Sequence, residues 1–121
     1  MVVRGIRGAI TAAKNERGAI LDATARLLAE IVRANDLAPD MVAAAFFTTS
    51  ADLNAAYPAE AARARGWTHV PLLCSHEMDV PGGLAACVRV LVLFNTDRTP
   101  EDIRHIYLDG AAALRPDLRS I

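Results

Sequence analysis

One segment of the chain, residues 84–94, constrains the fold more than any other. Its sequence, Leu-Ala-Ala-Cys-Val-Arg-Val-Leu-Val-Leu-Phe, is dominated by β-branched and large apolar residues. This composition is typical of a strand with apolar neighbours on both of its faces. We therefore expect this segment to be the central strand of a sheet.

Other patterns predict the elements around this strand. Apolar residues at spacings of three and four from residue 16 to residue 34 indicate one long helix lying on a sheet, with Asn15 as its cap. Pro58 and Gly66 mark the start and end of a second, shorter helix. The expected strands are 2–11, 41–49, 70–74, 84–94 and 104–108, the expected helices are 16–34 and 58–66, and single helical turns are expected at 99–102 and 111–118.

This order of elements predicts an α+β fold, in which a mixed β-sheet carries its helices on one face. The other face of the sheet then has no helix to cover its apolar residues. A bare apolar face is commonly covered by another copy of the same chain, so we expect a homo-oligomer. The length of 121 residues suits a single domain spanning residues 1–121.

Composition and charge exclude several classes of protein. The chain is 53% hydrophobic, which is too apolar for a disordered segment, and no apolar run approaches the roughly 20 residues needed to cross a bilayer. The net charge is -1 and the basic residues form no cluster, so neither a nucleic-acid nor a membrane partner is expected. A small anionic ligand remains possible.

Cofactor and compartment follow from what the sequence lacks. Cys74 and Cys87 have no partner at zinc or disulfide spacing, and His69, His76 and His105 are scattered. We therefore expect no metal and no cofactor. The chain begins with no secretory signal pattern, so a cytoplasmic location is expected, with both cysteines as thiols.

Arg89 is the most informative single residue. It interrupts the apolar central strand, and alternation places it on the face of Cys87, Leu91 and Leu93. A guanidinium among apolar neighbours loses hydration unless an anion or hydrogen-bond acceptors meet it. An anionic ligand, an internal salt bridge and a seam between subunits each account for this residue.

Other candidates have ordinary explanations beside the functional ones. Arg7 lies on a strand face of small residues that leaves room for a ligand, although for this residue taken alone a solvated strand arginine is the simpler explanation. Glu77 precedes a Pro-Gly-Gly loop at a strand end, where functional groups often cluster, but acidic loops are also commonly just solvated. Tyr107 and Arg115, taken alone, look like a core edge and a surface residue.

Several segments, taken together and in order, carry a family resemblance. They are Arg4-Gly5-Ile6-Arg7-Gly8-Ala9, Tyr57-Pro58-Ala59-Glu60-Ala61, Val70-Pro71-Leu72-Leu73-Cys74, Glu77-Met78-Asp79-Val80-Pro81-Gly82-Gly83, Arg104-His105-Ile106-Tyr107-Leu108 and Leu114-Arg115-Pro116-Asp117-Leu118. This set resembles the monofunctional, trimeric chorismate mutases of the Bacillus type, the AroH class. The resemblance covers the chain from its first strand to its tail with almost no insertion or deletion.

The resemblance implies an isomerase that converts chorismate to prephenate, at the branch of the shikimate pathway leading to phenylalanine and tyrosine. It also implies a homotrimer whose sheets form a pseudo-α/β barrel, with active sites in the clefts between subunits. The implied partner is the dianionic substrate chorismate, and no cofactor is implied.

Roles for individual residues also follow from the resemblance. Arg89 would meet the ether oxygen of the substrate, Arg7 would bind a carboxylate and Glu77 would contact the ring hydroxyl. The implied substrate-binding residues are Leu73, Cys74, Ser75 and His76 in a pocket-lining segment, Tyr107 at a carboxylate, and Tyr57, Arg63 and Arg115 from the adjoining subunit. The chain departs from some family members at Glu60, where they carry a basic residue, and at Leu73, where they carry a small hydroxyl residue.

Two other functions stay open at this point. One is a small trimeric enamine/imine deaminase, which has a similar subunit architecture and an intersubunit arginine, although segments 77–83 and 114–118 argue against it. The other is a non-catalytic, amino-acid-sensing regulatory domain of the α+β type. Turnover of chorismate would distinguish the mutase from both.

Overall fold

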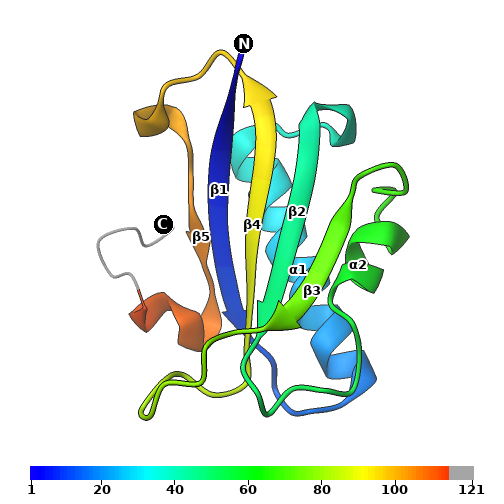
Figure 1. The fold of residues 1–121 in the computed structure, drawn as a ribbon, viewed down its shortest axis with the longest axis vertical. Helices are drawn as coiled ribbons and strands as arrows, with labels where there is room; N and C mark the ends of the chain where they lie inside the picture. Colours follow the sequence, from blue (N-terminus) through cyan, green and yellow to red (C-terminus); the bar gives the residue numbers. More distant parts are fainter. Residues whose placement is uncertain (115–121) are drawn as a thin grey trace.

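A five-stranded sheet with helices on one face organises the chain (Figure 1). The computed structural model describes residues 1–114. The elements are β1 (Val2–Thr11), α1 (Arg17–Asn35), β2 (Val42–Thr49), α2 (Ala59–Ala64), β3 (Leu72–His76), β4 (Cys87–Thr96) and β5 (Ile106–Tyr107), with short 3₁₀ turns η1 (Pro39–Met41), η2 (Pro100–Asp102) and η3 (Asp109–Ala113). The α+β class and the mixed sheet expected from the sequence are confirmed.

Strand β4 is the centre of the sheet, as its apolar sequence predicted. The strand order is β3-β2-β4-β1-β5. Strand β4 runs antiparallel to both β1 and β2, whereas β3 lies parallel to β2 and β5 lies parallel to β1 at the two edges. Because β4 is hydrogen-bonded along both sides, its residues have a fixed register to the strands on either side of it.

The core lies between the sheet and α1. Leu27, Leu28 and Ile31 of α1 are fully buried against the β4 residues of the helix-facing side, which include Val88 and Val92. None of the helices in the described range is long and apolar enough to cross a membrane.

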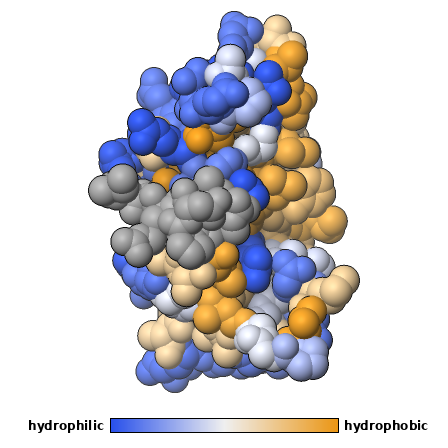
Figure 2. All heavy atoms as spheres, turned by 90° about the vertical axis from the view of Figure 1, so that its left-hand side faces the viewer, coloured by the Kyte–Doolittle hydropathy of each residue, from blue (hydrophilic) through white to orange (hydrophobic). Residues whose placement is uncertain are grey.

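The opposite face of the sheet is bare and apolar. Phe46, Leu91 and Leu73, from β2, β4 and β3, are 40%, 39% and 62% exposed there. Figure 2 shows hydrophobic residues gathered along the right-hand side of the molecule, which is the sheet face turned away from α1. The helix-free face expected from the order of the elements is therefore present.

The second helix, expected between Pro58 and Gly66, is present as Ala59–Ala64 with Pro58 at its N-cap, so it is shorter by one residue at its start and two at its end. Polar contacts hold the residues before it as a loop: the Oδ1 atom of Asn15 accepts the backbone N–H groups of Asn54 and Ala55 at 3.0 and 3.1 Å. The expectation that Asn15 caps α1 is wrong for the same reason. Glu16 is the N-cap, and its side chain makes no cap hydrogen bond.

Strand and tail boundaries differ as well. Strand β4 begins at Cys87 and not at residue 84, because Ala86 has a positive φ of 54° that interrupts the extended backbone. Strand β3 is displaced to Leu72–His76. The tail turn expected at 111–118 is present as η3, Asp109–Ala113, as far as the described residues extend.

Candidate active site

Arg89 lies in the middle of β4 on the face that the helices leave bare. Its neighbours in register are Ala9 of β1 and Thr48 of β2. The side chain is 40% exposed, so the guanidinium lies in an open cleft and is not enclosed by the apolar residues around it. Its Nε atom is 3.8 Å from Oε2 of Glu77, a distance that allows an ion pair but is too long for a hydrogen bond.

Glu77 reaches Arg89 because it directly follows β3. Its backbone N–H donates to the carbonyl of Thr49 at 2.8 Å, which continues the β2–β3 pairing by one residue. Oε1 of Glu77 accepts the N–H of Met78 at 2.9 Å, and the Thr48 hydroxyl is 3.5 Å from Oε2. The carboxylate is therefore oriented by its own loop and faces the cation across the cleft.

Four elements bring the central candidates to one cleft of about 360 Å³. Its polar lining comes from Arg7 of β1, Thr48 of β2, Glu77 after β3, Arg89 of β4 and Tyr107 of β5. Its apolar lining is Gly8, Ala9, Phe46, Val90 and Leu91. Two guanidinium groups and a phenol beside small residues form a site suited to a small anion.

Tyr107 enters this cleft from the edge of the sheet. It pairs with Ala9 across the β1–β5 ladder and is 7% exposed. Its ring packs in a small apolar cluster with Ala9, Cys87 and Ala111. Arg7 on the neighbouring strand is exposed, and its backbone N–H donates to Nδ1 of His105 at 2.9 Å.

The start of β4, two residues before Arg89, is held by side chains from the loop after β2. The Ser50 hydroxyl accepts the N–H of Cys87, and a carboxylate oxygen of Asp52 accepts the N–H of Ala86, both at 2.9 Å. A hydrogen bond from Ser50 lowers the pKa of Asp52. Burial raises the pKa of the Cys87 thiol, and the charge of Arg89 only partly offsets this effect, so the thiol is neutral at pH 7.

The segment 73–76 is divided between the two faces of the sheet. Leu73 and Ser75 are exposed on the same face as Arg89, because Ser75 pairs with Thr48. Cys74 and His76 alternate to the other face, where Nδ1 of His76 lies 3.0 Å from the Thr49 hydroxyl. Within one chain the structure thus separates Cys74 and His76 from the cleft of Arg89.

A second cleft, of about 540 Å³, contains Cys74 and His76. Tyr57, Glu60, Cys74, Ser75 and His76 are among its lining residues. Tyr57 is 70% exposed at the approach to α2, which carries the exposed Arg63. At Glu60, where the chain departs from some family members, the carboxylate pairs with Arg17 at 2.7 Å.

Sequence reasoning missed Thr48 and Asp52, and one predicted residue cannot be placed. Alternation along β2 could have put Thr48 on the face of Arg89, but Asp52 is recognisable only from its contact with Ala86. Arg115 lies outside the described residues. Among the residues that are described, no group of three or more His, Cys, Asp or Glu side chains could hold a metal ion.

Fold and cleft together define a class of protein: an α+β sheet protein with an arginine-lined site for a small anion. Comparisons with known proteins define the family. A sequence model of the family "Chorismate mutase type I" matches residues 3–118. The chain belongs to the type I chorismate mutases.

Individual relatives agree with this membership. The chain is 48% identical over 120 residues to chorismate mutase AroH of Thermus thermophilus, covering 98% of both chains. It is 43% identical over 119 residues to chorismate mutase AroH of Bacillus subtilis, covering 98% of this chain and 94% of the relative. The solved structure of a chorismate mutase from Clostridium thermocellum superposes with a TM-score of 0.89 at 44% identity, covering 91% of this chain and 98% of that one.

Proposed function

We propose that this protein rearranges chorismate to prephenate in the cleft lined by Arg7, Glu77, Arg89 and Tyr107, with Arg89 as the central catalytic residue. Membership of the type I family makes the protein a chorismate mutase, an isomerase of aromatic amino-acid biosynthesis. The observation that carries the assignment of the site is the position of Arg89, a half-exposed cation that shares one cleft with Arg7 and faces Glu77 at 3.8 Å.

The chemistry of the reaction explains why such a site suffices. Chorismate is a dianion that rearranges through a cyclic, concerted transition state in which a C–O bond breaks while a C–C bond forms. No proton is transferred, so neither a nucleophile nor a general base is needed. The protein can lower the barrier by selecting the compact conformer of the substrate and by stabilising the negative charge that develops on the ether oxygen.

Arg89 supplies the electrostatic part of this catalysis. As the C–O bond opens, its guanidinium would donate to the ether oxygen, and an oriented donor of this kind contributes about 3 to 4 kcal/mol to transition-state stabilisation. The planar fork of arginine can also hold a carboxylate oxygen at the same time, which a lysine cannot do with the same geometry. Glu77 would orient the guanidinium and contact the ring hydroxyl.

Arg7 and Tyr107 supply the conformational part. Both line the cleft, Arg7 two residues before Ala9 on β1 and Tyr107 paired with Ala9 on β5, and each would bind a substrate carboxylate. Holding the carboxylates fixes the compact conformer, which brings the two reacting carbon atoms together.

A homotrimer would complete the site. The apolar face with Phe46, Leu73 and Leu91 offers a surface that further copies of the chain can cover, as in a pseudo-α/β barrel. The separation of Cys74 and His76 from Arg89 within one chain supports a site shared between subunits. In this arrangement the substrate pocket at the subunit boundary would be lined by the remaining candidates, which are Tyr57, Arg63, Leu73, Cys74, Ser75, His76 and the tail residue Arg115.

Location and domain structure complete the proposal. The chain would act as one domain over residues 1–121 in the cytoplasm, where its free cysteines Cys74 and Cys87 would stay reduced. Family membership favours the mutase over an enamine/imine deaminase or an amino-acid-sensing domain.

A direct assay tests the function. The purified protein should consume the ultraviolet absorbance of chorismate and yield prephenate without any added cofactor. Arg89→Ala should lower kcat by about 10²- to 10³-fold or more, because it removes the donor to the ether oxygen. Replacing Arg89 with citrulline, which keeps the shape but not the charge, would show how much of the loss is electrostatic.

A matched control accompanies this variant. Arg33→Ala removes an arginine on the exposed side of α1 that pairs only with its helix neighbour Glu30 among the contacts described, so its kcat should stay within twofold of the parent. Circular dichroism and mass in solution should be the same for all variants. Full activity in Arg89→Ala would refute the assignment of the site, and absence of turnover in the parent would refute the function.

A further inference from the structure

The edge strand that carries Tyr107 is too short to hold its own register. Strand β5 comprises only Ile106 and Tyr107, which pair with Gly8 and Ala9 of β1. One further bond, from the N–H of Leu108 to the carbonyl of Ala9 at 2.9 Å, extends this pairing. A two-residue strand at a sheet edge has few ladder bonds, so other contacts must fix the position of Tyr107.

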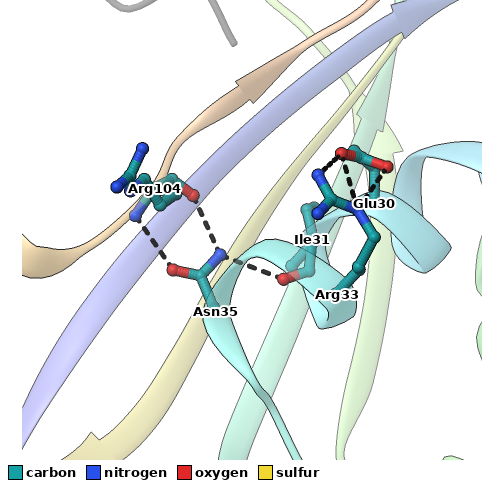
Figure 3. Close-up of polar contacts among 5 residues, drawn as sticks. All are labelled: Glu30, Ile31, Arg33, Asn35 and Arg104. Carbon is teal, nitrogen blue, oxygen red and sulfur yellow. Dashed lines mark hydrogen bonds and ion pairs between the residues drawn. The ribbon is translucent and has the colours of Figure 1, made fainter. Parts of the chain in front are cut away.

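A buried amide on α1 provides such a contact. Asn35, the last residue of α1, is 2% exposed. Its Nδ2 atom donates to the carbonyl of Arg104 and its Oδ1 atom accepts the N–H of Arg104, both at 2.9 Å (Figure 3). A carboxamide presents a donor and an acceptor side by side, so it pairs with a residue's backbone as a neighbouring strand would.

The helix end that carries this amide is itself firmly held. Nδ2 of Asn35 also donates to the carbonyl of Ile31 at 3.0 Å, within the last turn of α1. The Arg98 guanidinium donates to the carbonyl of Asn35, and Ile31 is fully buried in the core. Because α1 packs on the sheet through its apolar face, the position of Asn35 is fixed by the core. Its amide therefore also fixes the backbone of Arg104, three residues before Tyr107.

The other end of the segment has a second tie. The N–H of Gly110 donates to the Thr11 hydroxyl at 3.0 Å, and the Arg26 guanidinium binds both carboxylate oxygens of Asp109 at 2.8 and 3.3 Å. The Arg26 and Asp109 side chains are 60% and 42% exposed, so this ion pair is weak. The buried amide of Asn35 is therefore a stronger constraint on β5 than this ion pair.

We propose that Asn35 is a positioning residue for Tyr107: its amide holds the backbone of Arg104 so that β5 presents the phenol to the cleft beside Arg7. This inference rests on the carboxylate-binding role proposed for Tyr107. Asn35 itself lies on the helix-facing side of the sheet and does not touch the cleft. Its effect on catalysis is therefore indirect and runs through the strand.

The parent protein allows a first test without any substitution. Backbone hydrogen exchange should show a protected N–H at Arg104, even though the residue itself is exposed, because Oδ1 of Asn35 accepts that N–H. Exchange at the rate of an unbonded surface amide would overturn the inference.

A spectroscopic test reports on Tyr107 without substrate. The chain contains two tyrosines, so protein labelled with 3-fluorotyrosine gives two fluorine signals, which Tyr57→Phe assigns. Asn35→Ala and Asn35→Asp should shift or broaden the Tyr107 signal. Thr24→Val is the matched control, because Thr24 is a buried α1 residue whose hydroxyl bonds only within the helix among the contacts described, to Ile20. An unchanged Tyr107 signal in folded Asn35→Ala would overturn the inference.

Kinetics connect this position to function. A group that binds a carboxylate equally in the ground and transition states affects KM more than kcat, so Asn35→Ala should raise KM several-fold and change kcat less than twofold. In a Tyr107→Phe background, Asn35→Ala should add little to the rise in KM. If the rise in KM of the double variant equals the product of the rises in the two single variants, the inference is overturned. If Tyr107→Phe leaves KM unchanged, the proposed role of Tyr107 fails, while the fluorine and exchange results still decide the role of Asn35.

Discussion

At the scale of single residues, the site depends on side chains whose surroundings the sequence pattern does not show. Alternation places Arg89 on one face of the central strand, but the carboxylate that it faces belongs to Glu77, which directly follows the edge strand β3. Close packing inside the core is likewise not visible in the sequence pattern. Gly8 lies under α1, where a Cβ atom would approach Cδ1 of Ile31 to 2.8 Å, so a larger residue would force the Ile31 side chain to shift.

The packing at Gly8 leads to a prediction at this scale. Gly8→Ala should lower the free energy of unfolding by about 1 to 3 kcal/mol, because the new methyl group also comes within 3.2 Å of Leu27 and Val90. Gly18→Ala is its control: nothing lies within 4 Å of a Cβ at this helical position, so stability should rise by up to about 1 kcal/mol. Denaturant unfolding measures both, and equal effects of the two variants would contradict the packing argument.

At the scale of elements, short side-chain contacts determine where the strands begin and how they are held. Ser50 and Asp52 bind the backbone at Cys87 and Ala86 and so fix the entry to β4, two residues before Arg89. Asn15 does the same for the loop before α2, and Asn35 for β5. In each case a carboxylate, hydroxyl or amide supplies the partner that a regular ladder would otherwise supply.

Asp52 makes this bracing sensitive to acid. Its pKa is lowered in the folded protein, chiefly by a hydrogen bond from Ser50, so the ionised form stabilises the fold. This contribution is complete above the unfolded-state pKa of about 3.9 and is lost as pH falls through the lower, folded-state value. Asp52→Asn should therefore reduce the free energy of unfolding at pH 7, and its difference from the parent should shrink below about pH 4. Denaturant unfolding of both proteins between pH 7 and pH values below about 4 measures this difference. A difference that does not change with pH would refute the role of the ionised Asp52 carboxylate.

At the scale of the whole molecule, the bare sheet face is the feature that demands explanation. Its apolar residues lie beside the polar groups of the cleft, so covering the face with other copies would also enclose the site. Excluding water in this way strengthens the interaction of Arg89 with a developing negative charge. Assembly and catalysis would then depend on the same surface.

The proposed trimer is tested on this face. Leu91→Asp places a charge at the centre of the bare surface and should shift the mass in solution from trimer towards monomer, because an unpaired carboxylate is costly to bury. Ala29→Asp, on the exposed side of α1, should leave the mass unchanged. Light scattering measures both, and a Leu91→Asp protein that keeps the mass of the parent would argue against assembly through this face.

The order of the elements, the central strand and the face on which Arg89 lies could be predicted from the amino-acid sequence, because these features follow from local periodicity along the backbone. Which groups meet in the site depends on the tertiary fold. Three contacts depend on how loops close and strands align: the approach of Glu77 to Arg89, the pairing of Tyr107 with Ala9, and the bonds between Asn35 and Arg104. Such contacts join residues far apart along the chain, and no local pattern encodes their distances.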